Sequence, residues 1–170
     1  MTNRRLWWRH LISVLIAPAT MTVFIPGLII WLTGVKAPDL STPAGLLLAL
    51  VGGTLIALGL WFLVWTEVLF DHVGEGTLGI GSPVHLVLRG PYRHVRNPMM
   101  TAVFCIQLGT AVATASPWLF AWFALFATIV AIAIPTIEEP HLLRRFGAQY
   151  EAYRRHVPRW IPRVTPWAQA

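Results

Sequence analysis

The stretch from Met99 to Ile137 reads MMTAVFCIQLGTAVATASPWLFAWFALFATIVAIAIPTI and carries no charged side chain. Ser116-Pro117 interrupts it and leaves an apolar segment on either side. Roughly 20 apolar residues cross the hydrocarbon core of a bilayer. The stretch therefore predicts two membrane-spanning helices, at 98–115 and 117–137, joined by a tight turn.

Two earlier charge-free stretches, 11–33 and 44–66, predict two more spans of the same kind. A cleaved signal peptide is the alternative for the first, since three arginines precede it. Its apolar run continues to Leu32, which is longer than a cleavable segment, so we expect it to be retained. The sequence predicts one all-α domain over 1–170: a polytopic membrane protein with four transmembrane helices and a cytoplasmic C-terminal helix.

Composition agrees with a membrane protein. The chain is 56% hydrophobic and 12% charged, whereas soluble domains carry roughly 25% charged residues. A net charge of +6 would suggest a nucleic-acid partner in a soluble protein. Here the arginines flank apolar segments, so we expect no nucleic acid and a partnership with the lipid bilayer instead.

The basic residues also set the orientation. All of them except Lys36 fall in the N-terminal residues, the loop 67–98 or the tail after Ile137. Four spans place these three segments on one side, which the positive-inside rule makes cytoplasmic. We therefore expect a multi-pass protein of a bacterial inner membrane with both termini cytoplasmic.

The tail from Glu138 to about His156 is predicted to be helical. Its apolar residues recur at steps of three and four, as on one face of a helix, at positions Leu142, Leu143, Phe146, Tyr150 and Tyr153.

The loop before the third span holds a candidate anion site. Gly90-Pro91 indicates a turn, and Asn97-Pro98 indicates a helix start. Arg96 and Asn97 then lie at a helix N-terminus, which favours carboxylates and other anions. An ordinary helix cap with a snorkelling arginine is the alternative.

Glu138-Glu139 follows the fourth span directly and forms a candidate cation site. Adjacent carboxylates raise one another's pKa unless a cation intervenes, and Arg96, Arg144 and Arg145 are available. An ordinary interfacial pair bridged to Arg144 and Arg145 is the alternative. Because the third and fourth spans form a hairpin, the anion and cation sites become neighbours, and together they suit a zwitterion such as an amino-acid-bearing cofactor.

An ordered set of short motifs between residues 74 and 162 resembles the isoprenylcysteine carboxyl methyltransferase and phospholipid methyltransferase superfamily of integral membrane enzymes. Each motif is weak alone, but all the spacings hold. The motifs are Gly90-Pro91-Tyr92, Arg96-Asn97-Pro98, Glu138-Glu139, Phe146-Gly147 with Tyr150 and Tyr153, Val157-Pro158 and Ile161-Pro162.

The resemblance implies methyl transfer from S-adenosylmethionine, at the cytoplasmic membrane face, to a small or lipidic amine, thiol, hydroxyl or carboxylate. Glu138 would hold the cofactor's ammonium group and the Arg96-Asn97 helix start would face its carboxylate. The implied cofactor-binding residues are His85, Leu86, Val87, Gly90, Tyr92, Arg96, Asn97, Pro98, Met99, Met100, Glu138 and Glu139.

The implied catalytic residues are Glu139, His141, Arg96 and Arg144. Glu139 or His141 would take a proton from an amine, and an arginine would orient an anionic acceptor. Many relatives have His-Pro-x-Tyr where this chain has Asn97 to Met100. Eukaryotic isoprenylcysteine enzymes have an arginine at the position of Ile134, so isoprenylcysteine is not the expected substrate.

Two other functions are kept as alternatives. One is an NADPH-dependent membrane reductase of related architecture, such as the sterol reductases, although those are longer. The other is a non-catalytic four-helix membrane protein, a transporter or an assembly factor. Transporters carry ionisable residues within the membrane, and the predicted spans contain no charged residue.

Lesser features have ordinary explanations. Glu67, Asp71 and His72 either line an acceptor entrance or, as we expect, are solvated boundary residues. His94 and His141 could be metal ligands with Glu138, but nothing else in the sequence has ligand spacing, so no metal site is expected. The glycines at 52, 53 and 59 indicate close helix packing, within the chain or in a homodimer.

Overall fold

The computed structural model describes residues 15–74, 86 and 88–168, and every regular element in this part is helical, as predicted. Two of the elements, η1 and η3, are π-helical, and η2 is a 3₁₀ helix. The order is η1 Leu15–Phe24, α2 Ile25–Thr33, α3 Pro43–Gly74, η2 Gly90–Arg93, α4 Pro98–Thr114, α5 Pro117–Ala133, η3 Ile134–Glu138 and α6 Glu139–His156.

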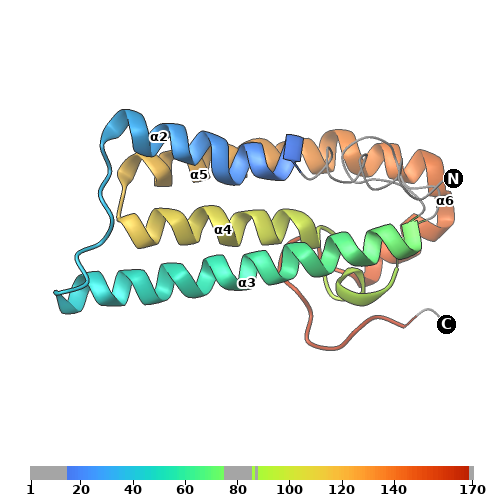
Figure 1. The fold of residues 1–170 in the computed structure, drawn as a ribbon. Coiled ribbons are helices and arrows are strands. Elements are labelled where there is room, and N and C mark those ends of the chain that lie inside the picture. The colour runs from blue at the N-terminus through green and yellow to red at the C-terminus, as the bar shows by residue number, and fades with distance from the viewer. Residues whose placement is uncertain (1–14, 75–85, 87, 169–170) are drawn as a thin grey trace, which may run out of the picture.

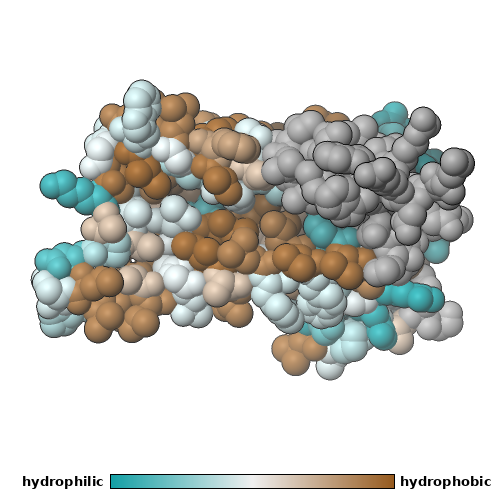
Figure 2. Space-filling view, in the orientation of Figure 1, coloured by the Kyte–Doolittle hydropathy of each residue, from teal (hydrophilic) through white to brown (hydrophobic). Residues whose placement is uncertain are grey.

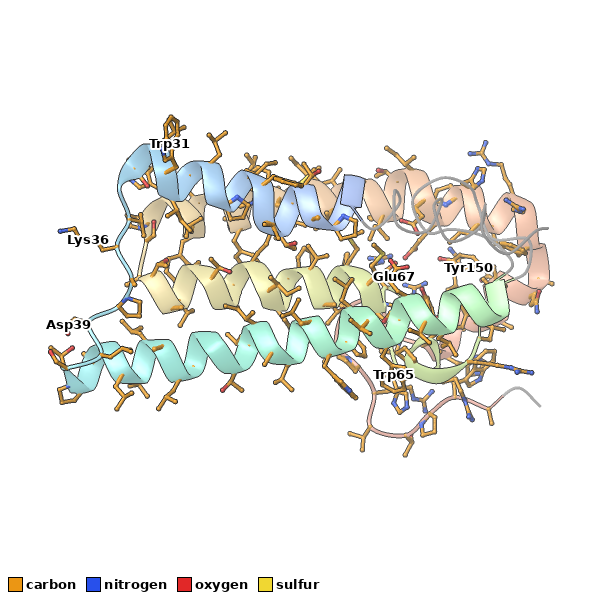
Figure 3. All side chains as sticks on the ribbon, in the orientation of Figure 1. Trp31, Lys36, Asp39, Trp65, Glu67 and Tyr150 are labelled. Atoms are coloured by element: carbon orange, nitrogen blue, oxygen red, sulfur yellow. The ribbon has the colours of Figure 1, made fainter. Side chains whose placement is uncertain are left out.

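The helices form an elongated bundle with two different ends (Figure 1). The α2–α3 connection and the α4–α5 turn lie at one end. At the other end, here called the site end, lie η2, α6 and the C-terminal segment 157–168. Lys36 and Asp39 mark the first end, and Glu67 and Tyr150 mark the site end (Figure 3).

The predicted hairpin between the third and fourth spans is confirmed. α4 ends at Thr114, and the next residue, Ala115, takes the left-handed conformation with φ 49°. Ser116 then begins α5, because its hydroxyl oxygen accepts a hydrogen bond from the N–H of Leu119 at 3.4 Å. A capping serine followed by proline at the first helical position explains why the chain reverses here.

The predicted start of the loop after the second span, at Glu67, is wrong, because α3 continues to Gly74. Charged residues at 67 and 71 mark where the apolar run ends, but a charge does not stop a helix. Glu67 is therefore a helical residue and not part of a loop.

α3 and α4 are in close contact through small residues. A Cβ on Gly52 would lie 2.5 Å from the carbonyl oxygen of Gly109, and one on Gly59 would lie 2.8 Å from the carbonyl oxygen of Ala102. Gly53 faces open space, with nothing within 4 Å. Close packing at Gly52 and Gly59 is thus within the chain.

The outer surface of the bundle is apolar. Figure 2 shows hydrophobic residues over the helices and hydrophilic residues towards the two ends. Two helices of the described chain are long and apolar enough to cross a membrane, Pro43–Leu69 and Pro117–His156, and only 17% of the apolar stretch in each is buried. Two shorter apolar helices accompany them, Pro18–Thr33 and Pro98–Thr114. These exposed apolar helices indicate association with a membrane.

α6 continues α5 through η3, and the charge-free part of this long helix ends at Ile137. Gly147 interrupts α6 with φ 51° and ψ −127°, a conformation that suits glycine. The predicted apolar face of α6 is confirmed, and its residues pack with Leu86 and Leu88 of the loop and with Val157 and Trp167 of the C-terminal segment. The α6 members of this cluster are Leu142, Leu143, Phe146, Tyr150 and Tyr153.

Candidate functional site

The C-terminal segment is attached along the loop that precedes α4. Backbone N–H groups donate from Arg96 to the oxygen of Pro158 at 2.9 Å, and from Arg163 to the oxygen of His94 at 3.0 Å. The N–H of Trp167 donates to the oxygen of Arg93 at 2.9 Å. The segment therefore fixes the loop that carries Arg96 and Asn97.

An ion-pair network joins this loop, α6 and the C-terminal segment. Glu139 is 7% exposed. Its Oε1 accepts from Arg159 Nε at 2.6 Å and lies 3.1 Å from Arg96 Nη2. Its Oε2 accepts from Arg159 Nη2 at 3.0 Å. Two guanidinium groups share one carboxylate, so the network has one positive charge in excess, which favours a bound anion.

One donor of this network remains available. Arg96 Nε is buried and has no hydrogen-bond partner among the described residues. Buried donors are nearly always paired in folded proteins. The first backbone N–H groups of α4 also have no partner within their own helix. Both observations fit an anionic ligand group at Arg96.

Asn97 is the N-cap residue of α4, as predicted, but its side chain makes no capping hydrogen bond in the described structure. Instead Asn97 Nδ2 donates to the carbonyl oxygen of Arg159 at 3.2 Å. The backbone of Arg159 thus binds Asn97, and its side chain binds Glu139.

Glu138 differs from its neighbour, because it is exposed at the surface. Partial desolvation, followed by repulsion from the Glu139 carboxylate, raises the pKa of Glu138. The two adjacent carboxylates are therefore in different environments. Glu139 is a buried counter-ion, and Glu138 is accessible to a cationic ligand group.

Three buried tyrosines, Tyr92, Tyr150 and Tyr153, lie at the site end of the bundle. Tyr153 donates its hydroxyl proton to the carbonyl oxygen of Tyr92 at 2.8 Å. Burial is the main cause that raises the pKa of Tyr92 and Tyr153, and burial and Glu139 raise the pKa of Tyr150 to about 12. All three remain neutral near pH 7, so they act as hydrogen-bonding and packing groups.

The other predicted cofactor-binding residues lie in the loop before α4, in the first turn of α4, or outside the described part of the chain. Leu86 packs against the α6 cluster, and Gly90 turns with φ 53° against Leu69. Pro98, Met99 and Met100 form the first turn of α4. His85 and Val87 lie outside the described residues.

Two predicted catalytic residues are on the surface. His141 is exposed on the first turn of α6. Arg144 is also exposed, and its Nε donates to the oxygen of Pro140 in its own helix at 3.3 Å. Arg145 lies over the ring of Phe146, with Cζ 5.4 Å from the ring centroid. The alternative explanation, in which Arg144 and Arg145 bridge the glutamate pair, is not what the structure shows, because Glu139 pairs with Arg96 and Arg159.

Sequence reasoning missed Arg159 and misjudged Glu67. Arg159 lies between Pro158 and Pro162, 20 residues from Glu139. Its place between the motifs Val157-Pro158 and Ile161-Pro162 was the only signal. Glu67 has a buried Oε1, and its charge contributes to the raised pKa of Tyr92. It is therefore turned towards the site end of the bundle and is not a solvated boundary residue.

Known proteins support the resemblance found in the sequence. A family model for phospholipid methyltransferases matches residues 47–149. Methanethiol S-methyltransferase 2 of Bradyrhizobium diazoefficiens is 37% identical over 73 residues, which cover 43% of this chain and 27% of the relative. The chain thus matches about a quarter of that relative's length. No solved structure matches this chain. Because the family model covers more than half of the chain and includes α4, Arg96 and the Glu138-Glu139 pair, the chain belongs to the phospholipid methyltransferase family.

Proposed function

We propose that this protein transfers a methyl group from S-adenosylmethionine to a small or lipidic acceptor at the cytoplasmic face of a membrane. The observation that carries the proposal is the network of Arg96, Glu139 and Arg159. It has an excess positive charge and a buried Arg96 Nε with no partner among the described residues. The accessible carboxylate of Glu138 directly precedes Glu139 in the sequence.

Each residue then has a defined task. Arg96 and the first N–H groups of α4 hold the carboxylate of the cofactor. Glu138 holds its ammonium group. When bound, S-adenosylmethionine would supply a methyl group from its positively charged sulfur atom. The bond between sulfur and methyl breaks, and the sulfur remains in a neutral thioether, the leaving group.

Glu139 serves as a positioning residue in this proposal and not as a general base. Both of its oxygens accept hydrogen bonds from Arg159, and Arg96 Nη2 lies 3.1 Å from its Oε1. Its task is to orient Arg96. Since the leaving group is already activated, alignment of the acceptor with the methyl group supplies much of the rate.

The name of the bacterial relative favours a thiol as the acceptor. In that case the acceptor loses its thiol proton to solvent and gains a carbon–sulfur bond. A neutral thiol partitions into the bilayer, which suits a site at the end of apolar helices. A lipid amine headgroup is the other acceptor suggested by the family.

The proposal includes four membrane crossings, two by the long helices and two by the shorter apolar ones. The basic residues then face the cytoplasm. Reporter domains fused to either terminus should both be active only as cytoplasmic reporters. A homodimer is compatible with this arrangement, since the apolar surface of α3 remains outside the bundle.

A transfer assay tests the function. Detergent-purified protein would be incubated with methyl-tritiated S-adenosylmethionine and with methanethiol, ethanethiol or a phosphatidylethanolamine vesicle. Tritium in a volatile sulfide supports the thiol acceptor, and tritium in lipid supports the amine. Binding of NADPH without binding of S-adenosylmethionine would instead favour the reductase alternative.

A further inference from the structure

Gln107 is a polar side chain in the middle of α4 that the proposed cofactor site does not use. It is 2% exposed. Neither Nε2 nor Oε1 has a hydrogen-bond partner within the described part of the chain. A buried amide with both atoms unpaired is costly, most of all in an apolar surrounding.

Other polar residues of α4 do not share this property. The hydroxyl groups of Thr101, Thr110 and Thr114 donate to backbone oxygens one turn earlier, at 3.0, 2.8 and 2.8 Å. These threonines satisfy their hydrogen bonds within the helix, as is usual in apolar helices. A glutamine has a donor and an acceptor that need a partner outside its own helix.

The helical repeat places Gln107 on the face of α4 that turns towards η1 and α5. Met100, Val103 and Phe104 precede it by seven, four and three residues and so share its face. They belong to an apolar cluster that includes Met21 of η1 and Phe126 of α5. Gln107 therefore lies between apolar helices, in a segment without charged residues.

The same cluster connects Gln107 to the candidate cofactor site. Trp160 packs into it, with its ring 5.7 Å from that of Phe104, and Trp160 follows Arg159 directly. Side chains in a helix lean towards its N-terminus, which for α4 is the site end. The amide thus lies on the membrane side of the site, about two helical turns from Pro98.

We propose that the Gln107 amide binds the polar group of the methyl acceptor, a neutral thiol or hydroxyl on an apolar body. This inference rests on the proposed methyl transfer. Such a group donates one hydrogen bond and accepts another, and so matches the two unpaired atoms. A charged acceptor is disfavoured there, because the surrounding helices contain no countercharge.

Two methionines on this face allow a ligand to enter a packed cluster. Met21 and Met100 both pack in it, and their unbranched side chains rearrange more easily than branched ones. Gln107 is a positioning residue in this scheme, since it holds the acceptor and exchanges no proton with it.

Three forms of the full-length protein test the inference: wild type, Gln107→Met and Thr110→Val. Methionine keeps the length of glutamine and removes the amide. Thr110→Val is the matched control, because it removes a hydroxyl group that already has a partner one turn away. Thermal unfolding in detergent should show that Gln107→Met is at least as stable as wild type, since an unpaired amide is lost.

The side-chain NH₂ resonance of Gln107 reports binding directly, without any need for turnover. It is assigned in ¹⁵N-labelled protein by its loss in Gln107→Met, and propane-1-thiol, propan-1-ol and propylammonium are then added separately. A saturable shift of this resonance with the thiol or the alcohol, and none with propylammonium, supports the proposal. The neutral probe that binds more tightly then identifies the acceptor class. A resonance that moves with neither neutral probe overturns it.

Kinetics separate this inference from the proposed function. With methanethiol as acceptor, Gln107→Met should raise KM at least tenfold while the affinity for S-adenosylmethionine stays within twofold. Thr110→Val should change neither. An unchanged KM in Gln107→Met overturns the Gln107 inference alone. A saturable amide shift in a wild type that transfers no methyl group would show a site for a neutral thiol or alcohol at Gln107, but it would contradict the transferase and with it the assignment of that ligand as a methyl acceptor.

Discussion

Arg159 binds Glu139 through two hydrogen bonds, from Nε to Oε1 at 2.6 Å and from Nη2 to Oε2 at 3.0 Å. The carbonyl oxygen of the same residue accepts from the side chain of Asn97. One residue of the C-terminal segment thus fixes both the start of α4 and the counter-ion of Arg96. The segment 157–168 is therefore part of the candidate active site.

Arg159→Ala should lower the free energy of unfolding by about 1–2 kcal/mol. Removing one partner of a buried pair costs roughly 3–5 kcal/mol, and partial exposure of Arg159 together with the remaining pair to Arg96 reduces this cost. Arg159→Lys should recover part of the loss. Arg155→Ala, which breaks an exposed pair with Glu151, is the control and should cost about 0–1 kcal/mol. Equal losses in Arg159→Ala and Arg155→Ala would contradict the role given to Arg159.

The affinity for S-adenosylmethionine should decrease as the pH falls through the pKa of Glu138. That pKa is raised above the ordinary 4.5, so Glu138 gains a proton at a higher pH than an ordinary glutamate does. The protonated form cannot pair with an ammonium group. Calorimetry at a series of pH values measures the effect. Glu138→Gln should bind weakly at every pH and lose this dependence, while Glu151→Gln should behave as wild type.

Gly52→Ala should destabilise the helix pair α3–α4 by about 1–3 kcal/mol, the usual cost of overpacking. The added methyl group would meet the backbone of Gly109, which cannot move aside as a side chain can. Gly53→Ala is the matched control, since its Cβ meets nothing within 4 Å. It should be neutral or stabilise the helix by up to about 1 kcal/mol. Thermal unfolding in detergent would refute this packing if both variants melted alike.

Tyr153→Phe should cost about 1–3 kcal/mol, because it leaves the buried carbonyl oxygen of Tyr92 without its donor. The hydroxyl group is neutral across the physiological range, so the loss should not depend on pH between 6 and 8. Urea or thermal unfolding at these two pH values checks both statements. A loss that appears at one pH only would contradict them.

Helix starts were predictable because short motifs determine them. Ser116-Pro117 and Asn97-Pro98 precede α5 and α4, as expected. The end of α3 was placed too early, because the apolar pattern reports where the hydrophobic segment ends, and a helix can continue beyond it to Gly74.

The candidate site was predictable only in part. Arg96 and Glu139 were expected to be neighbours, and their ion pair confirms it. The contribution of Arg159 depends on how the segment after Pro158 returns to the loop before α4, which no local pattern encodes. Gln107 had a signal in the sequence, a polar amide within a charge-free apolar segment, but only the packing of α4 reveals that its amide is buried and unpaired.

Calorimetric titration of S-adenosylmethionine and S-adenosylhomocysteine into detergent-purified protein tests the central claim most directly. Wild type should bind both ligands. Arg96→Lys should bind at least tenfold more weakly, since lysine keeps the charge but lacks the Nε donor, and Arg154→Lys should bind as wild type. Absence of binding to a wild-type protein that unfolds cooperatively on heating would contradict the assignment of this site.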